Sequence, residues 1–216
     1  FVNLHKKAIL WSKWSAGLRP EDIIQSMVIP FSCQYLINKT LGATVLSQQV
    51  GRGNLDHQIL LAKIAKVTVL EHLSSLVLQY FDRAEELGIN IRETNLRLVM
   101  GHGEAWAESY RKRVETDYGI VFRNMYGMTE AGELASECEY GSGMHICADT
   151  CIVEVIDPET LRPLSPGEEG EIVVTNFYRK AVPRIRFRTA DIAKILPYEP
   201  CPCGRTLPNM SMIKGP

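Results

Sequence analysis

The sequence lacks any apolar run near the ~20 residues that a membrane-spanning helix requires. Residues 1–13 have neither the apolar core nor the small-residue cleavage site of a signal peptide. An excess of one charge is also absent, because 24 basic residues face 25 acidic ones, and no overall field would draw the chain to nucleic acid or to a membrane surface. We therefore expect a cytoplasmic protein that acts on a small molecule, with neither a nucleic-acid nor a membrane partner.

Disulfide bonds are not expected. A chain of 216 residues with 45% hydrophobic content can bury a sizeable core, and small disulfide-stapled folds are usually secreted. The six cysteines are therefore interpreted as reduced thiols or metal ligands. There is also no internal repeat and no low-complexity segment.

The first part of the chain alternates short apolar runs with longer amphipathic stretches, which is typical of βαβ units around a parallel sheet. Strands are predicted at residues 42–46, 67–70, 96–100 and 121–125. Helices are predicted at residues 55–65, 72–87 and 105–118, and glycines follow the second and third of them.

Short strands and turn residues fill the rest of the chain. Strands are predicted at residues 151–156, 171–175, 185–188 and 192–196, separated by turns such as Asp157-Pro158 and Ser165-Pro166-Gly167. The fold class is therefore α/β: residues 1–137 form a parallel-sheet subdomain that binds nucleotide and acyl group, and residues 138–216 form a small β-barrel subdomain.

The segment richest in chemistry is Tyr126-Gly127-Met128-Thr129-Glu130, directly after a predicted strand. Loops at the carboxyl ends of parallel strands bind ligands in open α/β sheets. An aromatic face can stack on a base, a glycine lets backbone approach a phosphate, a hydroxyl can donate to phosphate oxygens, and a carboxylate can hold Mg²⁺. The alternative is a strand-to-helix loop in which Thr129 and Glu130 only cap the next helix.

Tyr126 to Glu130 resembles the nucleotide motif of adenylate-forming enzymes, and the order of segments resembles phenylacetate-coenzyme A ligases along nearly the whole chain. The further matching segments are Gly103-Glu104-Ala105-Trp106, Ile156-Asp157-Pro158-Glu159-Thr160, Gly167-Glu168-Glu169-Gly170-Glu171 and Phe187-Arg188-Thr189-Ala190-Asp191. The resemblance implies a partial N-terminal domain of an AMP-forming acid:coenzyme A ligase that uses ATP, Mg²⁺, coenzyme A and a carboxylic acid such as phenylacetate. Relatives are often homodimers, which makes a homodimer a possible assembly here.

The resemblance also implies roles for single residues. Thr129 would contact the α-phosphate and Glu130 would bind Mg²⁺, and these two would be the catalytic residues. Tyr126 would lie against adenine, Gly127 would belong to the same nucleotide-binding loop, and Asp191 would accept hydrogen bonds from the ribose hydroxyls. An ionised aspartate is acceptor-only and suits a vicinal diol, although a turn cap is the alternative.

Other members of the matching segments have less defined roles. Gly103 and Glu104 would border the nucleotide, and Trp106 would border the adenine or acyl pocket unless it simply belongs to the core. Arg188 would contact phosphate or form a structural ion pair. The family's acyl-pocket segment departs most at residues 27–36, and for this reason the acid is not identified.

A second group is typical of a metal site. Cys138 and His145 lie close together on a glycine-containing stretch, and Cys201-Pro202-Cys203-Gly204 places two thiolates on a tight turn. Four such ligands suit a closed, tetrahedral and therefore structural zinc ion. Cys147 and Cys151 are rival ligands, and Cys151 begins an alternating strand and is expected to face the core.

Two family features are not found in the sequence: the Ser/Thr/Gly-rich loop that cradles the ATP phosphates and the C-terminal domain with its lysine. We therefore expect a central fragment that is inactive by itself. Two other functions stay open. One is adenylylation of a deazaflavin coenzyme, and the other is a non-catalytic, zinc-stapled nucleotide-binding or scaffold module.

Overall fold

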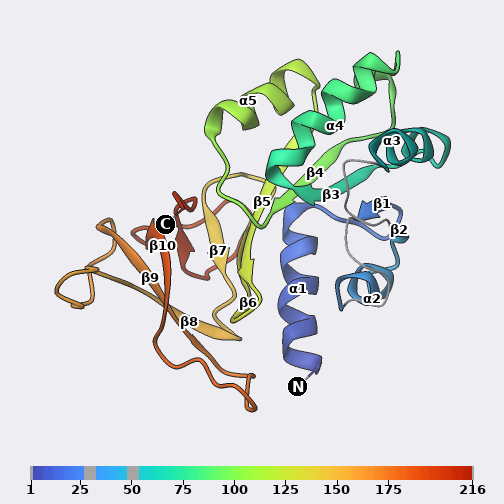
Figure 1. Ribbon diagram of the computed structural model, residues 1–216. Helices are drawn as coiled ribbons and strands as arrows, with labels where there is room; N and C mark the ends of the chain where they lie inside the picture. Colours follow the sequence, from blue (N-terminus) through green and yellow to red (C-terminus); the bar gives the residue numbers. More distant parts are fainter. Residues whose placement is uncertain (1, 27–32, 48–53, 216) are drawn as a thin grey trace. The chain divides into compact units, whose positions relative to one another are not determined.

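The computed structural model describes residues 2–26, 33–47 and 54–215. These residues form two compact units, one made of residues 17–123 and the other of residues 1–16 together with residues 124–216. Figure 1 follows the chain through both units. The expected domain boundary after residue 137 stays a prediction, since a compact unit need not be an independently folding domain.

The unit of residues 17–123 is built on a parallel sheet, as the alternating pattern predicts. Its strands lie in the order β2-β1-β3-β4, and the helices α3, α4 and α5 lie on one side of them and α2 on the other (Figure 1). The elements are β1 (Ile23–Ser26), α2 (Cys33–Thr40), β2 (Thr44–Ser47), α3 (Leu55–Ile64), β3 (Val69–Leu73), α4 (Ser74–Glu86), η2 (Ile91–Glu93), β4 (Leu98–His102) and α5 (Glu108–Asp117). Strand β5 (Val121–Met128) begins in this unit and ends in the other.

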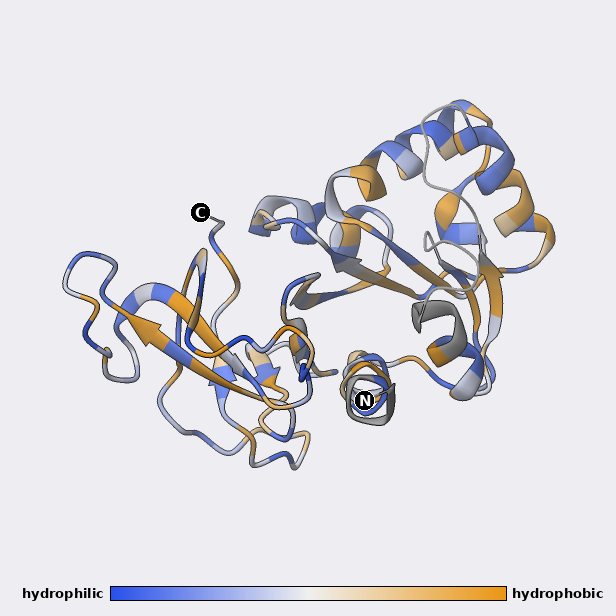
Figure 2. Ribbon diagram, turned by 60° about the horizontal axis from the view of Figure 1, so that its bottom comes forward, coloured by the Kyte–Doolittle hydropathy of each residue, from blue (hydrophilic) through white to orange (hydrophobic). Residues whose placement is uncertain are grey.

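The core of this unit forms because its helices are amphipathic. Val77, Phe81 and Ala84 follow the helical repeat along α4, and all three are fully buried against strand residues such as Leu70 and Val99. Figure 2 shows hydrophilic and hydrophobic residues alternating along the helices in the same way. Gly88, at φ +71°, follows the end of α4 in the left-handed conformation that glycine adopts without a steric penalty.

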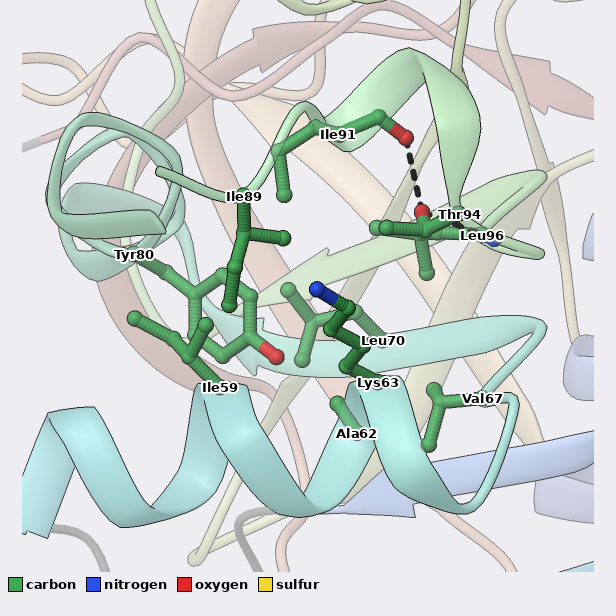
Figure 3. Close-up of a pocket in the computed structure, with 10 residues that line it drawn as sticks. All are labelled: Ile59, Ala62, Lys63, Val67, Leu70, Tyr80, Ile89, Ile91, Thr94 and Leu96. Atoms are coloured by element: carbon green, nitrogen blue, oxygen red, sulfur yellow. Dashed lines mark hydrogen bonds between the residues drawn. The ribbon is translucent and has the colours of Figure 1, made fainter. Parts of the chain in front are cut away.

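One pocket opens into this core between α3, β3, α4 and η2 (Figure 3). Its lining is mostly apolar and consists of Ile59, Ala62, Lys63, Val67, Leu70, Tyr80, Ile89, Ile91, Thr94 and Leu96. The Tyr80 hydroxyl donates to Gln25 Oε1 at 3.0 Å, which satisfies this buried polar group. None of the residues that the sequence assigns to ligand binding lines the pocket.

One histidine lies elsewhere than the sequence predicts. The predicted helix at residues 72–87 begins at His72, but His72 belongs to β3 and is 1% exposed. Strand β3 runs to Leu73 and α4 begins at the next residue, so the change of element leaves no spacer that a hydrophobic pattern could reveal. Burial lowers the pKa of His72 to about 4, and the ring is therefore neutral at physiological pH.

The second unit consists of antiparallel strands and one long helix. Strands β5, β6, β7 and β11 form one ladder, β8, β9 and β10 form another, and an isolated bridge pairs Ile195 with Met210 of β11. The elements are α1 (Val2–Ala16), the end of β5, β6 (Gly132–Glu137), β7 (Met144–Ile146), β8 (Cys151–Ile156), β9 (Glu169–Asn176), β10 (Phe187–Lys194) and β11 (Asn209–Met210). Helix α1 packs against β6, and Leu134, Ile172 and Val174 lie in the shared core.

The last predicted strands are wrong in one respect. Residues 185–188 and 192–196 were expected as two strands, whereas one strand, β10, runs from Phe187 to Lys194. Its register against β9 shifts between Arg188 and Ile192, and the bulged residues are polar enough to break the hydrophobic alternation.

No helix among the described residues combines the length and apolar character that crossing a membrane requires.

Candidate functional site

The motif Tyr126 to Glu130 forms the tip of a β-hairpin. Strand β5 continues to Met128, the chain turns over residues 129–131, and β6 returns antiparallel from Gly132. The alternative of a strand-to-helix loop in which Thr129 and Glu130 only cap the next helix is therefore wrong, because a strand and not a helix follows. Thr129 and Glu130 are exposed at the tip.

Gly127 has a steric reason for its identity. The hairpin register is irregular between Tyr126 and Gly127. A Cβ atom on Gly127 would lie 2.8 Å from the Gly132 carbonyl oxygen and 3.2 Å from Glu133 Cα. Backbone on the partner strand cannot move away as a side-chain end can, and so only glycine fits this irregularity.

Tyr126 and Asp191 meet in this unit although 65 residues separate them in the sequence. The Tyr126 hydroxyl donates to Asp191 Oδ2 at 2.7 Å, and the tyrosine is 8% exposed. Burial, followed by the hydrogen bond to Asp191, raises the pKa of Tyr126 well above its ordinary value, and the hydroxyl therefore keeps its proton. The structure thus brings together two residues that the resemblance assigns to one nucleotide.

One side chain at the end of β9 and one two residues after it hold the hairpin tip. Asn176 Nδ2 donates to the Ala131 carbonyl oxygen at 2.7 Å, and the Tyr178 hydroxyl donates to the same oxygen at 3.0 Å. All three residues are buried. No pattern in the sequence indicates this pair, because neither residue belongs to a motif and each acts through a distant carbonyl.

Gly103 and Glu104 lie in the unit of residues 17–123. Gly103 has φ +81°, and a Cβ atom there would lie 2.9 Å from Leu73 Cδ2. The Glu104 carboxylate accepts hydrogen bonds from the backbone N–H of Ser75 at 2.7 Å and from its hydroxyl at 3.1 Å. A carboxylate at the start of α4 is favourable because the first N–H groups of a helix lack partners. The proposed contacts of both residues with nucleotide stay predictions.

Trp106 is 9% exposed and stacks on Phe122 with ring centroids 4.0 Å apart and planes 9° from parallel. It therefore lies in the hydrophobic core, which was the alternative to a pocket position. For Arg188, the structure shows the ion-pair alternative, with Glu171 of β9 as the partner. Residues 27–32 of the expected acyl-pocket segment lie outside the described residues, and Cys33–Thr40 form α2.

The four predicted metal ligands gather at one place. The ligand atoms of Cys138, His145, Cys201 and Cys203 all lie within 4.8 Å of one another, with three of the residues buried. Cys138 follows the end of β6, His145 lies on β7, and the other two lie on the Cys201–Gly204 turn, where the Gly204 N–H donates to the Cys201 carbonyl. The rivals Cys147 and Cys151 are buried but do not belong to the group.

The spacing of these atoms fits a tetrahedral ion. Cys138 Sγ and Cys201 Sγ are 3.7 Å apart, and Cys203 Sγ and His145 Nε2 are 3.3 Å apart. Zinc bonds of about 2.3 Å to sulfur and about 2.0 Å to nitrogen give a sulfur–sulfur edge of about 3.8 Å and a sulfur–nitrogen edge of about 3.5 Å. These two distances are therefore close to the edge lengths of a zinc tetrahedron.

The thiols of this group differ in acidity. Burial raises the pKa of Cys138 to about 11. Burial also acts to raise the pKa of Cys201, but hydrogen bonds from Ser142, Cys203 and Cys138 outweigh it and lower the value to about 7. Burial lowers the pKa of His145, which keeps the imidazole neutral and able to coordinate. The donor set therefore matches the soft and borderline ligands that zinc prefers.

Comparisons with known proteins identify the family of the chain. Residues 3–177 match the family model of AMP-binding enzymes. The chain belongs to the AMP-binding enzyme family. Among curated proteins it is 32% identical over 180 residues to a phenylacetate-coenzyme A ligase of Thermus thermophilus, covering 82% of this chain and 40% of that protein. It is 31% identical over 179 residues to the ligase of the same name from Escherichia coli, covering 81% and 40%.

Solved structures show the same fold. A 2-hydroxyisobutyryl-CoA ligase in complex with 2-HIB-AMP and CoA superposes with a TM-score of 0.90 at 24% identity, covering 99% of this chain and 47% of that one. A long-chain-fatty-acid-CoA ligase from Archaeoglobus fulgidus gives a TM-score of 0.67 at 16% identity, covering 97% and 47%. The chain spans about two fifths of the length of the curated relatives it matches.

Proposed function

We propose that the protein containing this chain is an ATP-dependent ligase that activates a carboxylic acid as acyl-AMP and transfers the acyl group to coenzyme A. The observation that carries the proposal is the hydrogen bond between Tyr126 and Asp191 beside the exposed tip with Thr129 and Glu130. The two curated relatives described above are named phenylacetate-coenzyme A ligases, which supports an aryl acid such as phenylacetate as the substrate.

Asp191 would bind the ribose. An ionised carboxylate offers about four acceptor positions, and Tyr126 occupies one of them. The 2′- and 3′-hydroxyls would donate to the others, while the Tyr126 ring would lie against adenine. Gly103 and Glu104, which follow the end of β4, would border the nucleotide as the resemblance implies.

The reaction would proceed in two displacements. A carboxylate oxygen of the acid attacks the α-phosphorus of ATP, and the bond from that phosphorus to pyrophosphate breaks. The thiolate of coenzyme A then attacks the acyl carbon, and the bond from that carbon to the AMP oxygen breaks. Thr129 would donate to an α-phosphate oxygen, and Glu130 would hold Mg²⁺, which offsets charge on the phosphates when bound.

The Cys138, His145, Cys201 and Cys203 group is proposed as a structural zinc site. Four protein ligands leave no open position for substrate, and the site is therefore not catalytic. Zinc would tie the stretch after β6 to the Cys201–Gly204 turn and reduce the disorder of both. The cytoplasmic location and the homodimer stay predictions.

The test is acid-dependent exchange of pyrophosphate into ATP by the full-length protein. Phenylacetate and aliphatic acids of similar size should be compared, and the thioester product should be identified by mass spectrometry. Asp191→Asn and Glu130→Gln should each reduce exchange by at least ~tenfold, because each removes a charge-assisted contact. Asp149→Asn, which changes an exposed aspartate of the same unit, should retain exchange.

The outcomes separate the functions that the sequence left open. Nucleotide binding without exchange for any acid would favour the scaffold module. AMP transfer to a deazaflavin without a thioester product would favour the other synthetase activity. Acid-dependent exchange that is equal in Asp191→Asn and wild type would contradict the proposed nucleotide site.

A further inference from the structure

Asp191 lies in a bulge of β10 that has an unusual backbone. Between Arg188 and Ile192 the strand β10 advances four residues while its partner β9 advances two, from Val173 to Glu171. Ala190, in the middle of the bulge, has φ +65°, a conformation that costs an L-residue about 1–2 kcal/mol. Such a backbone persists only where the surroundings hold it.

Glu171 of β9 holds this bulge with both carboxylate oxygens. Its Oε1 accepts the backbone N–H of Ala190 at 3.1 Å. Its Oε2 accepts Arg188 Nε at 2.8 Å and also contacts Arg188 Nη2. One side chain therefore binds the residue that enters the bulge and the residue in its middle.

Thr189 completes the fixation. Its hydroxyl donates to the Ile172 carbonyl of β9 at 3.0 Å and accepts the backbone N–H of Asp191 at 3.1 Å. The three residues before Asp191 are thus each bound to β9 at residue 171 or 172. The direction in which Asp191 presents its carboxylate to Tyr126 follows from these contacts.

The electrostatics of Glu171 suit a fixed support. The Glu171 side chain is 6% exposed, whereas the Arg188 side chain is 50% exposed. The hydrogen bond from Arg188 lowers the pKa of Glu171, so the carboxylate is ionised at neutral pH. A buried carboxylate with several donors is strongly bound to one geometry, because any displacement leaves it unpaired.

We propose that Glu171 is a positioning residue for ribose recognition: it fixes the β10 bulge, and the bulge sets Asp191 for the 2′- and 3′-hydroxyls of the nucleotide. This inference rests on the proposed nucleotide site at Asp191. Glu171 itself touches no substrate. It acts through the backbone of Ala190 and through Arg188.

The test compares the affinity of the full-length protein for AMP and for 2′,3′-dideoxy-AMP by calorimetry. Glu171→Gln keeps the size of the side chain but places an NH₂ group opposite the donors of Arg188. AMP affinity should fall about tenfold, which is the range of one charge-assisted hydrogen bond. Affinity for the dideoxy analogue should change less than about twofold, because that analogue has no hydroxyls for Asp191 to accept.

A double-mutant cycle and two further variants complete the design. In an Asp191→Asn background, Glu171→Gln should lower AMP affinity by less than about twofold, since the group it positions is already lost. Glu169→Gln is the matched control, because Glu169 lies on β9 as Glu171 does and its exposed ion pair with Lys214 is removed. This variant should leave the affinities for AMP and for the dideoxy analogue unchanged. Arg188→Met removes the ion-pair partner of Glu171. It should therefore lower the affinity for AMP but not that for the dideoxy analogue, as Glu171→Gln does.

The inference and the proposed function fail in different ways. Wild-type protein that binds AMP and the dideoxy analogue equally would contradict the ribose site at Asp191. Discrimination that depends on Asp191 but is unchanged in both Glu171→Gln and Arg188→Met would overturn the positioning role alone. Equal losses for the two ligands would also overturn it, because they indicate only general destabilisation.

Discussion

Replacing Ala190 by glycine should stabilise the protein, although glycine usually weakens a strand. Ala190 is exposed. Ala190 has φ +65°, where an L-residue pays about 1–2 kcal/mol and glycine pays almost nothing. Glycine loses more backbone freedom on folding, which costs about 0.5–1 kcal/mol. The difference predicts a net gain of about 0.5–1 kcal/mol in the free energy of unfolding for Ala190→Gly.

The measurement is urea unfolding of wild type and Ala190→Gly, followed by circular dichroism, with the midpoint compared at unchanged slope. Ala193→Gly is the control for the backbone conformation, since Ala193 lies in the same strand and is not among the residues with positive φ, but it is 0% exposed whereas Ala190 is exposed. That variant should lose about 1 kcal/mol or more. An Ala190→Gly variant that is destabilised as much as the control would refute the claim that the bulge is strained.

Three further predictions concern the metal, the core and the pH dependence. The purified chain should contain one equivalent of zinc by mass spectrometry, and Cys201→Ser should lose it while Cys151→Ser retains it; equal zinc in all three would exclude the site. Gly101→Ala should lower the free energy of unfolding by about 1–3 kcal/mol, because the added Cβ would clash with the ring of Phe122. An unchanged thermal unfolding midpoint would contradict this prediction. The hydrogen bond from Arg188 lowers the pKa of Glu171 below 4.5, so the ion pair stabilises the protein fully above pH 4.5. This stabilisation is lost as pH falls through the lower folded-state pKa. The difference in the free energy of unfolding between wild type and Glu171→Gln should therefore begin to shrink as pH falls below 4.5, and a constant difference down to the lowest pH would contradict the pairing.

Local pattern was sufficient for much of the fold. The strand at residues 151–156 has the predicted bounds, and the predicted helix at residues 55–65 corresponds to α3. Both segments have a hydrophobic period of their own and are ended by ordinary turn or cap residues. The parallel sheet of residues 17–123 followed from the alternation of short strands and helices in that part of the chain, without any knowledge of contacts between distant residues.

Features that depend on distant partners were out of reach. The β10 bulge is held by Glu171 and Ile172, which lie 17 to 19 residues earlier in the chain, and the sequence alone divided this strand into two. The hairpin at Thr129 was missed for a similar reason: an antiparallel partner, β6, extends β5 beyond the apolar run that marked it. The β-propensity of single residues cannot predict such pairing, because the stabilising contacts come from the partner strand.

The candidate site was only partly accessible from sequence. Ligand chemistry and the resemblance together selected Cys138, His145, Cys201 and Cys203, and their atoms do gather. Tyr126 and Asp191 were also named, and they are hydrogen-bonded. The supports Glu171 and Asn176 were not identified, because a buried glutamate or asparagine in a strand has no local signature that separates it from a solvated one.

The proposed ligase activity depends most on attack of the acid at the α-phosphorus of ATP. The direct measurement is to supply phenylacetate labelled with ¹⁸O in its carboxylate to the full-length protein, with ATP and coenzyme A, and to analyse the nucleotide product by mass spectrometry. Attack at the α-phosphorus predicts AMP that carries one ¹⁸O atom, transferred when the thiol displaces the acyl group. Unlabelled nucleotide with ¹⁸O in inorganic phosphate, accompanied by ADP, would contradict the account.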